Sequence, residues 1–144
     1  MIFNRRKEYS GAFDYLIVGL GNPGRQYEDT RHNAGFICLD MLSEKYSVKV
    51  NKLKFKSLMG EARISGKRCL LLKPQTFMNN SGVAVAALMA FYKIPLENVI
   101  VIHDDMDIPV GDCRTKIGGG SAGHNGIKSI DAAIGPNYKR IRIG

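Results

Sequence analysis

Residues 16–35 read LIVGLGNPGRQYEDTRHNAG, and this stretch decides the fold. Its first three residues form a continuous apolar run, too short for a helix and typical of a strand buried on both faces. A cluster of Gly and Pro then ends the strand, and His32 arrives at the start of an amphipathic run. Open α/β sheets bind ligands beyond the carboxyl ends of their strands. We therefore expect Asn22 and His32 to take part in chemistry.

The glycine run from Gly19 to Gly24 also matches the dinucleotide fingerprint GxGxxG. That motif requires a helix that starts inside the run, so that its amino terminus meets the pyrophosphate. Here Pro23 interrupts the run, and the helix is expected to begin only near Thr30. An acidic residue at the end of a second strand, about 20 residues further on, is also missing. The sequence therefore favours a site without a nucleotide cofactor.

The length and the cysteines set the general class. The 144 residues predict one domain over 1–144, in which residues 1–14 form an amino-terminal extension. Cys38, Cys69 and Cys113 are scattered and lack CxxC spacing, which indicates a reducing compartment rather than disulfides or zinc. The sequence contains neither a signal peptide nor an apolar stretch of membrane-spanning length. We expect no membrane association.

The basic charge is unevenly distributed. The chain has 21 Lys and Arg against 13 Asp and Glu, a formal net charge of +8. Residues 45–73 hold nine basic side chains against one acid, and residues 113–144 hold six against one. Although a lysine run is often only a solvated face, this asymmetry favours a polyanionic partner, most often nucleic acid.

Strand and helix patterns alternate along the chain, which predicts a three-layer α/β/α sandwich around a mixed twisted sheet. A β-hairpin is expected at residues 57–73, after a basic connector at 49–56. Strands are predicted at 16–18, 57–64, 68–73, 98–102, 113–117 and 140–143, and helices at 35–46, 81–92 and 121–134.

Polar side chains gather where strands end and helices begin. If the strands at 16–18 and 98–102 are neighbours, Asp104 and the loop carrying His32 share one rim of the sheet. A carboxylate beside an imidazole fixes its tautomer and stabilises the imidazolium formed on proton uptake, so the pair can activate water. Asparagine amides can hold an ester carbonyl or its oxyanion. The polar rim comprises Asn22, His32, Asn79, Asp104, His124 and Asn125. These residue types are those of an ester or amide hydrolase that works without a metal.

Simpler interpretations stay open at this point. A single histidine at a helix start is more often a capping or packing residue, and Asn79 or Asn80 fits a helix cap. Residues 103–107 (HDDMD) offer ligands for Mg²⁺, although alternate strand residues face opposite ways and only part of the run can meet one ion. Residues 118–120 form either a phosphate-binding nest or a tight turn.

Four stretches, taken together, resemble bacterial peptidyl-tRNA hydrolase over residues 15–144: GLGNPGRQYEDTRHNAG, KPQTFMNNSG, HDDMDIPVG and KIGGGSAGHNG. The resemblance implies a phosphorylase/hydrolase-like α/β/α fold. It also implies cleavage of the ester between peptide and tRNA in ribosome-free peptidyl-tRNA, a step that supports translation. Members of that family are cytoplasmic monomers that need no metal or cofactor.

The resemblance also implies a role for each matching residue. His32 corresponds to the catalytic base and Asp104 to the acid that stabilises its basic form, while Asn22 matches the residue that discriminates blocked from free aminoacyl ends. Lys116 and Arg142 resemble the basic pair that grips the tRNA 5′-phosphate. The positions that resemble contacts to the acceptor end or the nascent peptide are Tyr27, Phe77, Asn79 and Asn125.

Two departures from the family accompany the resemblance. The chain has about a dozen residues before the first strand, and the family continues past the last strand into a helical segment over the cleft. We therefore expect the carboxyl-terminal part of the domain to be missing. The alternatives to the enzyme are a non-catalytic RNA-binding module of the same fold, as in RNA-splicing relatives, or an inactive fragment.

Overall fold

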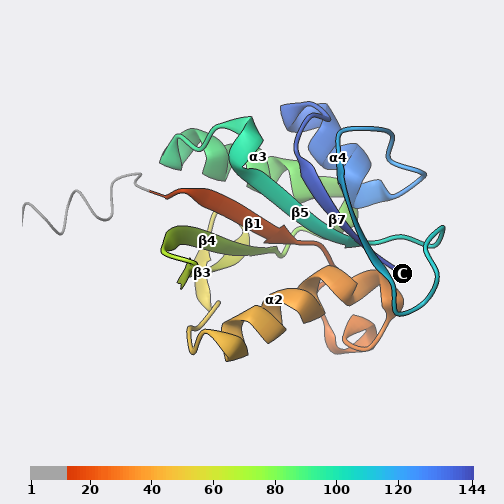
Figure 1. The fold of residues 1–144 in the computed structure, drawn as a ribbon, viewed down its shortest axis with the longest axis horizontal. Coiled ribbons are helices and arrows are strands. Elements are labelled where there is room, and N and C mark those ends of the chain that lie inside the picture. The colour runs from red at the N-terminus through yellow and green to blue at the C-terminus, as the bar shows by residue number, and fades with distance from the viewer. Residues whose placement is uncertain (1–12) are drawn as a thin grey trace, which may run out of the picture.

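The computed structural model describes residues 13–144 and consists of one mixed, twisted sheet with helices on both faces (Figure 1). The sheet has seven strands in the order β2-β3-β4-β1-β5-β7-β6. The fold is therefore the predicted three-layer α/β/α sandwich. Of the amino-terminal extension predicted at residues 1–14, all but the last two residues lie outside the described part of the chain.

Parallel strands form the centre of the sheet. β1 (Tyr15–Gly19) lies between β4 (Lys67–Pro74) and β5 (Val99–Asp104), and β7 (Lys139–Ile143) pairs with the other side of β5. The predicted neighbourhood of the first strand and the strand at 98–102 is thus confirmed. β5 runs two residues further than expected, so that Asp104 is its last residue.

Antiparallel strands close both edges. β3 (Ser57–Ile64) and β4 form the predicted hairpin, and β6 (Cys113–Ile117) pairs with β7. A short strand that the sequence did not predict, β2 (Lys52–Lys54), pairs with β3 inside the expected connector. Its three residues are too few to show an alternating pattern, and lysine is depleted in strands, so only the partner strand specifies it.

Three α-helices cover the sheet (Figure 1). α2 (Ala34–Lys45) packs on one face, and α3 (Ser81–Tyr92) and α4 (Asn125–Ile134) pack against each other on the other. α4 starts four residues later than expected, because the positive φ angles at residues 118, 119, 122 and 123 keep the glycine-rich segment outside the helix. Short 3₁₀ turns are η1 (Arg25–Tyr27), η2 (Arg31–Asn33), η3 (Met78–Asn80) and η4 (Leu96–Asn98).

Alternation along β1 divides the core into two layers. Leu16 and Val18 pack with residues of α3 and α4, whereas Ile17 packs on the α2 side with Leu39. All four side chains are buried, as a strand covered on both faces requires. No helix in the described residues has the length and apolar character needed to cross a bilayer.

Gly35 allows α2 to approach the sheet closely. A Cβ atom at this position would lie 2.3 Å from the backbone nitrogen of Leu20 and 2.4 Å from the carbonyl oxygen of Ile102. These distances are far below van der Waals contact, so only glycine fits. The close approach places η2, and with it His32, beside the carboxyl ends of β1 and β5.

Candidate active site

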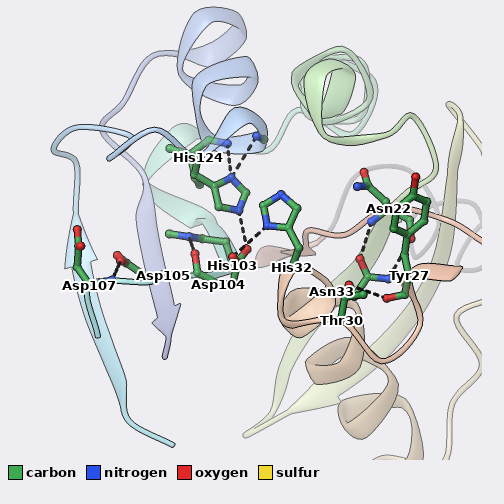
Figure 2. A network of polar contacts seen from close by, with 12 residues as sticks. Asn22, Tyr27, Thr30, His32, Asn33, His103, Asp104, Asp105, Asp107 and His124 are labelled. Carbon is green, nitrogen blue, oxygen red and sulfur yellow. Dashed lines mark hydrogen bonds and ion pairs between the residues drawn. The ribbon is translucent and has the colours of Figure 1, made fainter. Parts of the chain in front are cut away.

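His32 and Asp104 form the centre of the polar rim (Figure 2). His32 lies in η2, directly before α2, and Asp104 ends β5. His32 Nδ1 lies 3.0 Å from Asp104 Oδ2. The prediction that the two share one rim is confirmed, and the interpretation of His32 as a mere capping residue is not supported. Because Nδ1 faces a carboxylate, it carries the proton, and the lone pair of Nε2 remains available.

His124 is the second imidazole on the same carboxylate. Its Nε2 donates to Asp104 Oδ1 at 2.8 Å, while its Nδ1 accepts the backbone N–H groups of Gly126 and Ile127 at 3.1 and 3.2 Å. His124 is thus the amino-terminal cap of α4, and these two bonds fix its tautomer. The sequence placed His124 in the polar rim but assigned it no role, because its contact with Asp104 depends on long-range packing.

The charges of this cluster support each other. Burial by itself would raise the pKa of Asp104, but hydrogen bonds from His124 and His32 outweigh it and hold this pKa well below its usual range. The hydrogen bond to Asp104 raises the pKa of His32, although partial burial opposes the shift. Asp104 is therefore ionised over the whole physiological range, and His32 has a stronger affinity for a proton than an isolated imidazole.

His103 holds the backbone of Asp104. Its Nδ1–H donates to the Asp104 carbonyl oxygen at 2.8 Å, and its ring meets the His124 ring edge-on at 5.1 Å. Burial lowers the pKa of His103 to about 4, so this imidazole is neutral near pH 7. Asp105 accepts from Arg142 Nε at 2.9 Å and from the backbone of Asp107 at 2.9 Å. The side chains of His103, Asp104 and Asp105 are therefore engaged in internal contacts, so the HDDMD run does not present them together to one ion.

The rim also contains a set of potential metal ligands. One donor atom from each of His32, Asp104 and His124 lies within 4.8 Å of the others. However, His124 Nδ1 accepts two backbone N–H groups, so its Nε2 retains the proton and lacks the lone pair that a metal needs. The three residues therefore fit a hydrogen-bonded relay better than a metal centre.

Asn22 is clamped on two sides (Figure 2). Its Oδ1 accepts the backbone N–H of Met78 at 2.9 Å. Asn33 binds its backbone from the other side, accepting from Asn22 N at 2.7 Å and donating to Asn22 O at 2.9 Å. These bonds leave the Asn22 Nδ2 amide free to donate to a substrate. Asn33, next to His32 in the chain, was not predicted as a site residue, and its role appears only from these contacts.

Tyr27 and Phe77 form an aromatic pair beside Asn22. Their rings meet edge-to-face with centroids 6.3 Å apart, and Phe77 is 51% exposed. The backbone of Phe77 has φ 58° and ψ 161°, a region occupied almost only by glycine. Strain of this kind concentrates at functional sites. Asn79 and Asn125 follow as exposed side chains at the starts of α3 and α4, and Asn80, the residue before α3, makes no side-chain cap bond.

The two predicted phosphate-binding cations differ in their surroundings. Lys116 is exposed on β6, whereas Arg142 on β7 is paired with Asp105. In the β6–β7 register, Lys116 faces Arg140 and not Arg142. Arg140 is only 1% exposed and donates to the carbonyls of residues 119, 120 and 136 and to the Asp131 carboxylate, so it belongs to the core.

A cavity of about 160 Å³ opens beside the carboxylate. It is lined by His32, Asp104 and His124, by residues 103 and 105–107, and by residues 121–123 of the glycine-rich loop. An acid that fixes an imidazole beside a cavity can act with it as a general base, without a nucleophilic serine or cysteine.

Comparisons with known proteins identify the family of this chain. The family model described as "Peptidyl-tRNA hydrolase" matches residues 16–144. The peptidyl-tRNA hydrolase of Caldanaerobacter subterraneus subsp. tengcongensis is 55% identical over 131 residues, which cover 90% of this chain and 71% of the relative. That of Bartonella henselae is 52% identical over 130 residues, covering 90% and 67%.

A solved structure gives the same result. The crystal structure of peptidyl-tRNA hydrolase from Acinetobacter baumannii matches with a TM-score of 0.87 and 43% identity, covering 94% of this chain and 70% of that one. The alternative of a non-catalytic RNA-binding module is not favoured. The chain belongs to the peptidyl-tRNA hydrolase family.

Proposed function

We propose that the chain hydrolyses the ester between peptide and tRNA in peptidyl-tRNA, with His32 as the general base. The observation that carries this proposal is the double hydrogen bond to Asp104. Because the carboxylate accepts the Nδ1–H of His32, it holds the ring in the tautomer whose Nε2 can take a proton from water. His124 completes the arrangement by holding the other carboxylate oxygen.

The reaction follows from this geometry. His32 Nε2 removes a proton from water as the oxygen attacks the ester carbonyl, and Asp104 stabilises the imidazolium. The tetrahedral oxyanion then collapses and the bond to the ribose oxygen breaks. That oxygen takes the proton back from His32, which yields a peptide acid and free tRNA. Near neutral pH the acid loses its proton to solvent.

The remaining rim residues are proposed as substrate ligands. The free amide of Asn22 discriminates a blocked from a free amino end, and Asn79 and Asn125 hold the ester and its oxyanion. The exposed ring of Phe77 and the half-buried ring of Tyr27 offer an aromatic surface to the acceptor end or the peptide. Support comes from the hydrogen bond between Asn22 and the backbone of Met78, from the ring contact of Tyr27 with Phe77, and from the strained backbone of Phe77.

We propose that the tRNA 5′-phosphate binds Lys116 and Arg142 beside the rim. The exposed ammonium of Lys116 supports its part. Arg142 keeps its Nε on Asp105, so it reaches a phosphate with the other edge of its guanidinium.

We further propose that residues 15–144 belong to a single peptidyl-tRNA hydrolase-like domain, and that the protein is a cytoplasmic monomer that needs no metal. The three cysteines are free thiols, as expected in a reducing compartment. The fixed tautomer of His124 supports a reaction without a metal.

The test is the release of N-acetyl-aminoacyl groups from tRNA by the purified protein, compared with His32→Ala. We expect the substitution to lower kcat by at least ~10²-fold while tRNA affinity stays near wild type, because a general base acts only in the transition state. Near-normal cleavage by the His32→Ala protein would refute the proposed mechanism. A wild-type protein that binds tRNA but releases no product would favour the RNA-binding module.

A further inference from the structure

The edge of the sheet at β2 carries a second group of cations, away from Lys116. We propose that Lys52, Lys54 and Lys56, here called the β2 basic surface, bind the phosphate backbone of the tRNA whose ester the rim cleaves. This inference rests on the proposed function, since it assigns more of the same substrate. Its partner is an RNA backbone and not a small phosphate.

The charges of this surface are uncompensated. Lys52 and Lys56 are exposed and Lys54 is half-buried. Among the described residues, no carboxylate forms an ion pair with any of the three. Glu61, the acid in the adjoining groove, is paired with Arg68. A polyanion would therefore gain contacts here without first displacing an internal partner.

Aromatic side chains orient the ammonium of Lys54 without neutralising its charge. Lys54 Nζ lies 4.2 Å from the centroid of the Phe91 ring, and the Phe55 and Phe91 rings are 5.2 Å apart. Phe55 and Lys56 have φ values of 52° and 55°, which form a tight turn after β2. Because the ring orients the ammonium while its charge remains, less side-chain entropy is lost when an anion binds.

The surface is continuous with the substrate loop of the candidate active site. Lys54 pairs with Ser57 in the β2–β3 ladder, and Ser57 pairs with Pro74, the last residue of β4. The carbonyl of Lys56 then accepts the backbone N–H of Gln75 at 2.9 Å. Phe77 follows two residues later, so the basic turn borders the loop that holds the substrate.

The strand order indicates why the partner is a polymer. β2 and β6 are the two edges of the sheet, and Asp104 ends β5, which lies between them. Six spacings of about 4.8 Å separate the edges by about 29 Å. An RNA backbone that reaches both Lys116 and the β2 basic surface spans this distance across the rim, whereas a single phosphate does not.

The experiment compares two double variants of the whole chain. Lys52→Ala with Lys56→Ala removes two charges from the β2 basic surface, and Lys45→Ala with Lys67→Ala removes two exposed lysines elsewhere as a matched control. The affinity for deacylated tRNA is measured over a range of salt concentrations, together with kcat and KM for N-acetyl-aminoacyl-tRNA.

We expect the β2 variant to lower the slope of log affinity against log salt by about two units. It should raise KM about tenfold with kcat within about twofold, whereas the control variant should match wild type in all three. Equal slopes in the two variants would overturn the inference. So would self-association of the β2 variant with unchanged tRNA binding, because the lysines would then only prevent strand pairing.

The same measurements separate this inference from the proposed function. The wild-type protein could bind tRNA with a salt dependence that falls when Lys52 and Lys56 are replaced, yet release no aminoacyl product. In that case the proposal for the β2 basic surface stands and the proposed function fails. If the wild-type protein cleaves the ester but the two double variants show the same salt dependence of tRNA affinity, the proposed function stands and the proposal for the β2 basic surface is wrong.

Discussion

The substitution Asp104→Asn should disable His32 by changing its tautomer as well as by removing a charge. His124 cannot change its tautomer, because its Nδ1 accepts two backbone N–H groups. The amide oxygen of the substituted side chain must therefore accept the buried His124 Nε2–H. The amide NH₂ then faces His32 Nδ1, which becomes an acceptor, and the proton moves to Nε2, where a base needs a lone pair.

The expected loss of kcat in Asp104→Asn follows from two contributions. A carboxylate about 4 Å from an imidazolium contributes about 4 kcal/mol at an effective dielectric constant of about 20. Because the His32 side chain is 41% exposed, solvent screening reduces this to about 2 kcal/mol. The wrong tautomer, or an unmade hydrogen bond, adds about 2 kcal/mol. The sum of about 4 kcal/mol corresponds to a kcat lowered by about 10³-fold.

The assay is ester cleavage of N-acetyl-aminoacyl-tRNA from about pH 5 to pH 9. In the wild type, Asp104 raises the pKa of His32, so activity is lost as the pH falls through this raised value. In the variant, the acid limb of kcat/KM should move to lower pH. Asp112→Asn, at an exposed carboxylate outside the rim, serves as the control. A loss below tenfold with an unmoved acid limb would refute the reasoning.

Two further substitutions test the supports of the site. Phe77→Gly should raise the free energy of unfolding by about 1 kcal/mol, because it relieves the strained backbone at φ 58° and ψ 161°. It should also raise KM, since the exposed ring is lost. A variant that is less stable than wild type in urea denaturation would contradict this. Arg140→Met should lower the free energy of unfolding by about 3 kcal/mol, since it removes the buried cation from Asp131, which keeps only the Tyr138 hydroxyl, and a donor from three loop carbonyls. Arg140→Lys should lose less, and equal urea midpoints for wild type and Arg140→Met would refute the assigned burial role.

The sequence by itself determined the layers of the fold and the identity of the central pair. Hydrophobic periodicity is a local property, so the strand at 16–18, the hairpin and the three helices could be recognised from neighbouring residues. The polar residues that follow each strand are local signals as well. His32 and Asp104 were therefore named as partners, on the condition that their strands lie side by side.

Only the tertiary structure decided how that pair is held. His32 and Asp104 are 72 positions apart in the sequence, and their contact depends on the pairing of β1 with β5. The tautomer of His124 and the clamp of Asn33 on Asn22 likewise depend on contacts between distant segments.

The tertiary structure also decided which basic residues are accessible to a partner. From the sequence, Arg140, Arg142 and Lys116 count equally as positive charge, yet the first is buried and the second is paired, and only Lys116 is an exposed cation. Composition records how many charges a segment carries. Burial and pairing, which depend on the packing of β6, β7 and α4, decide which of them a partner can reach.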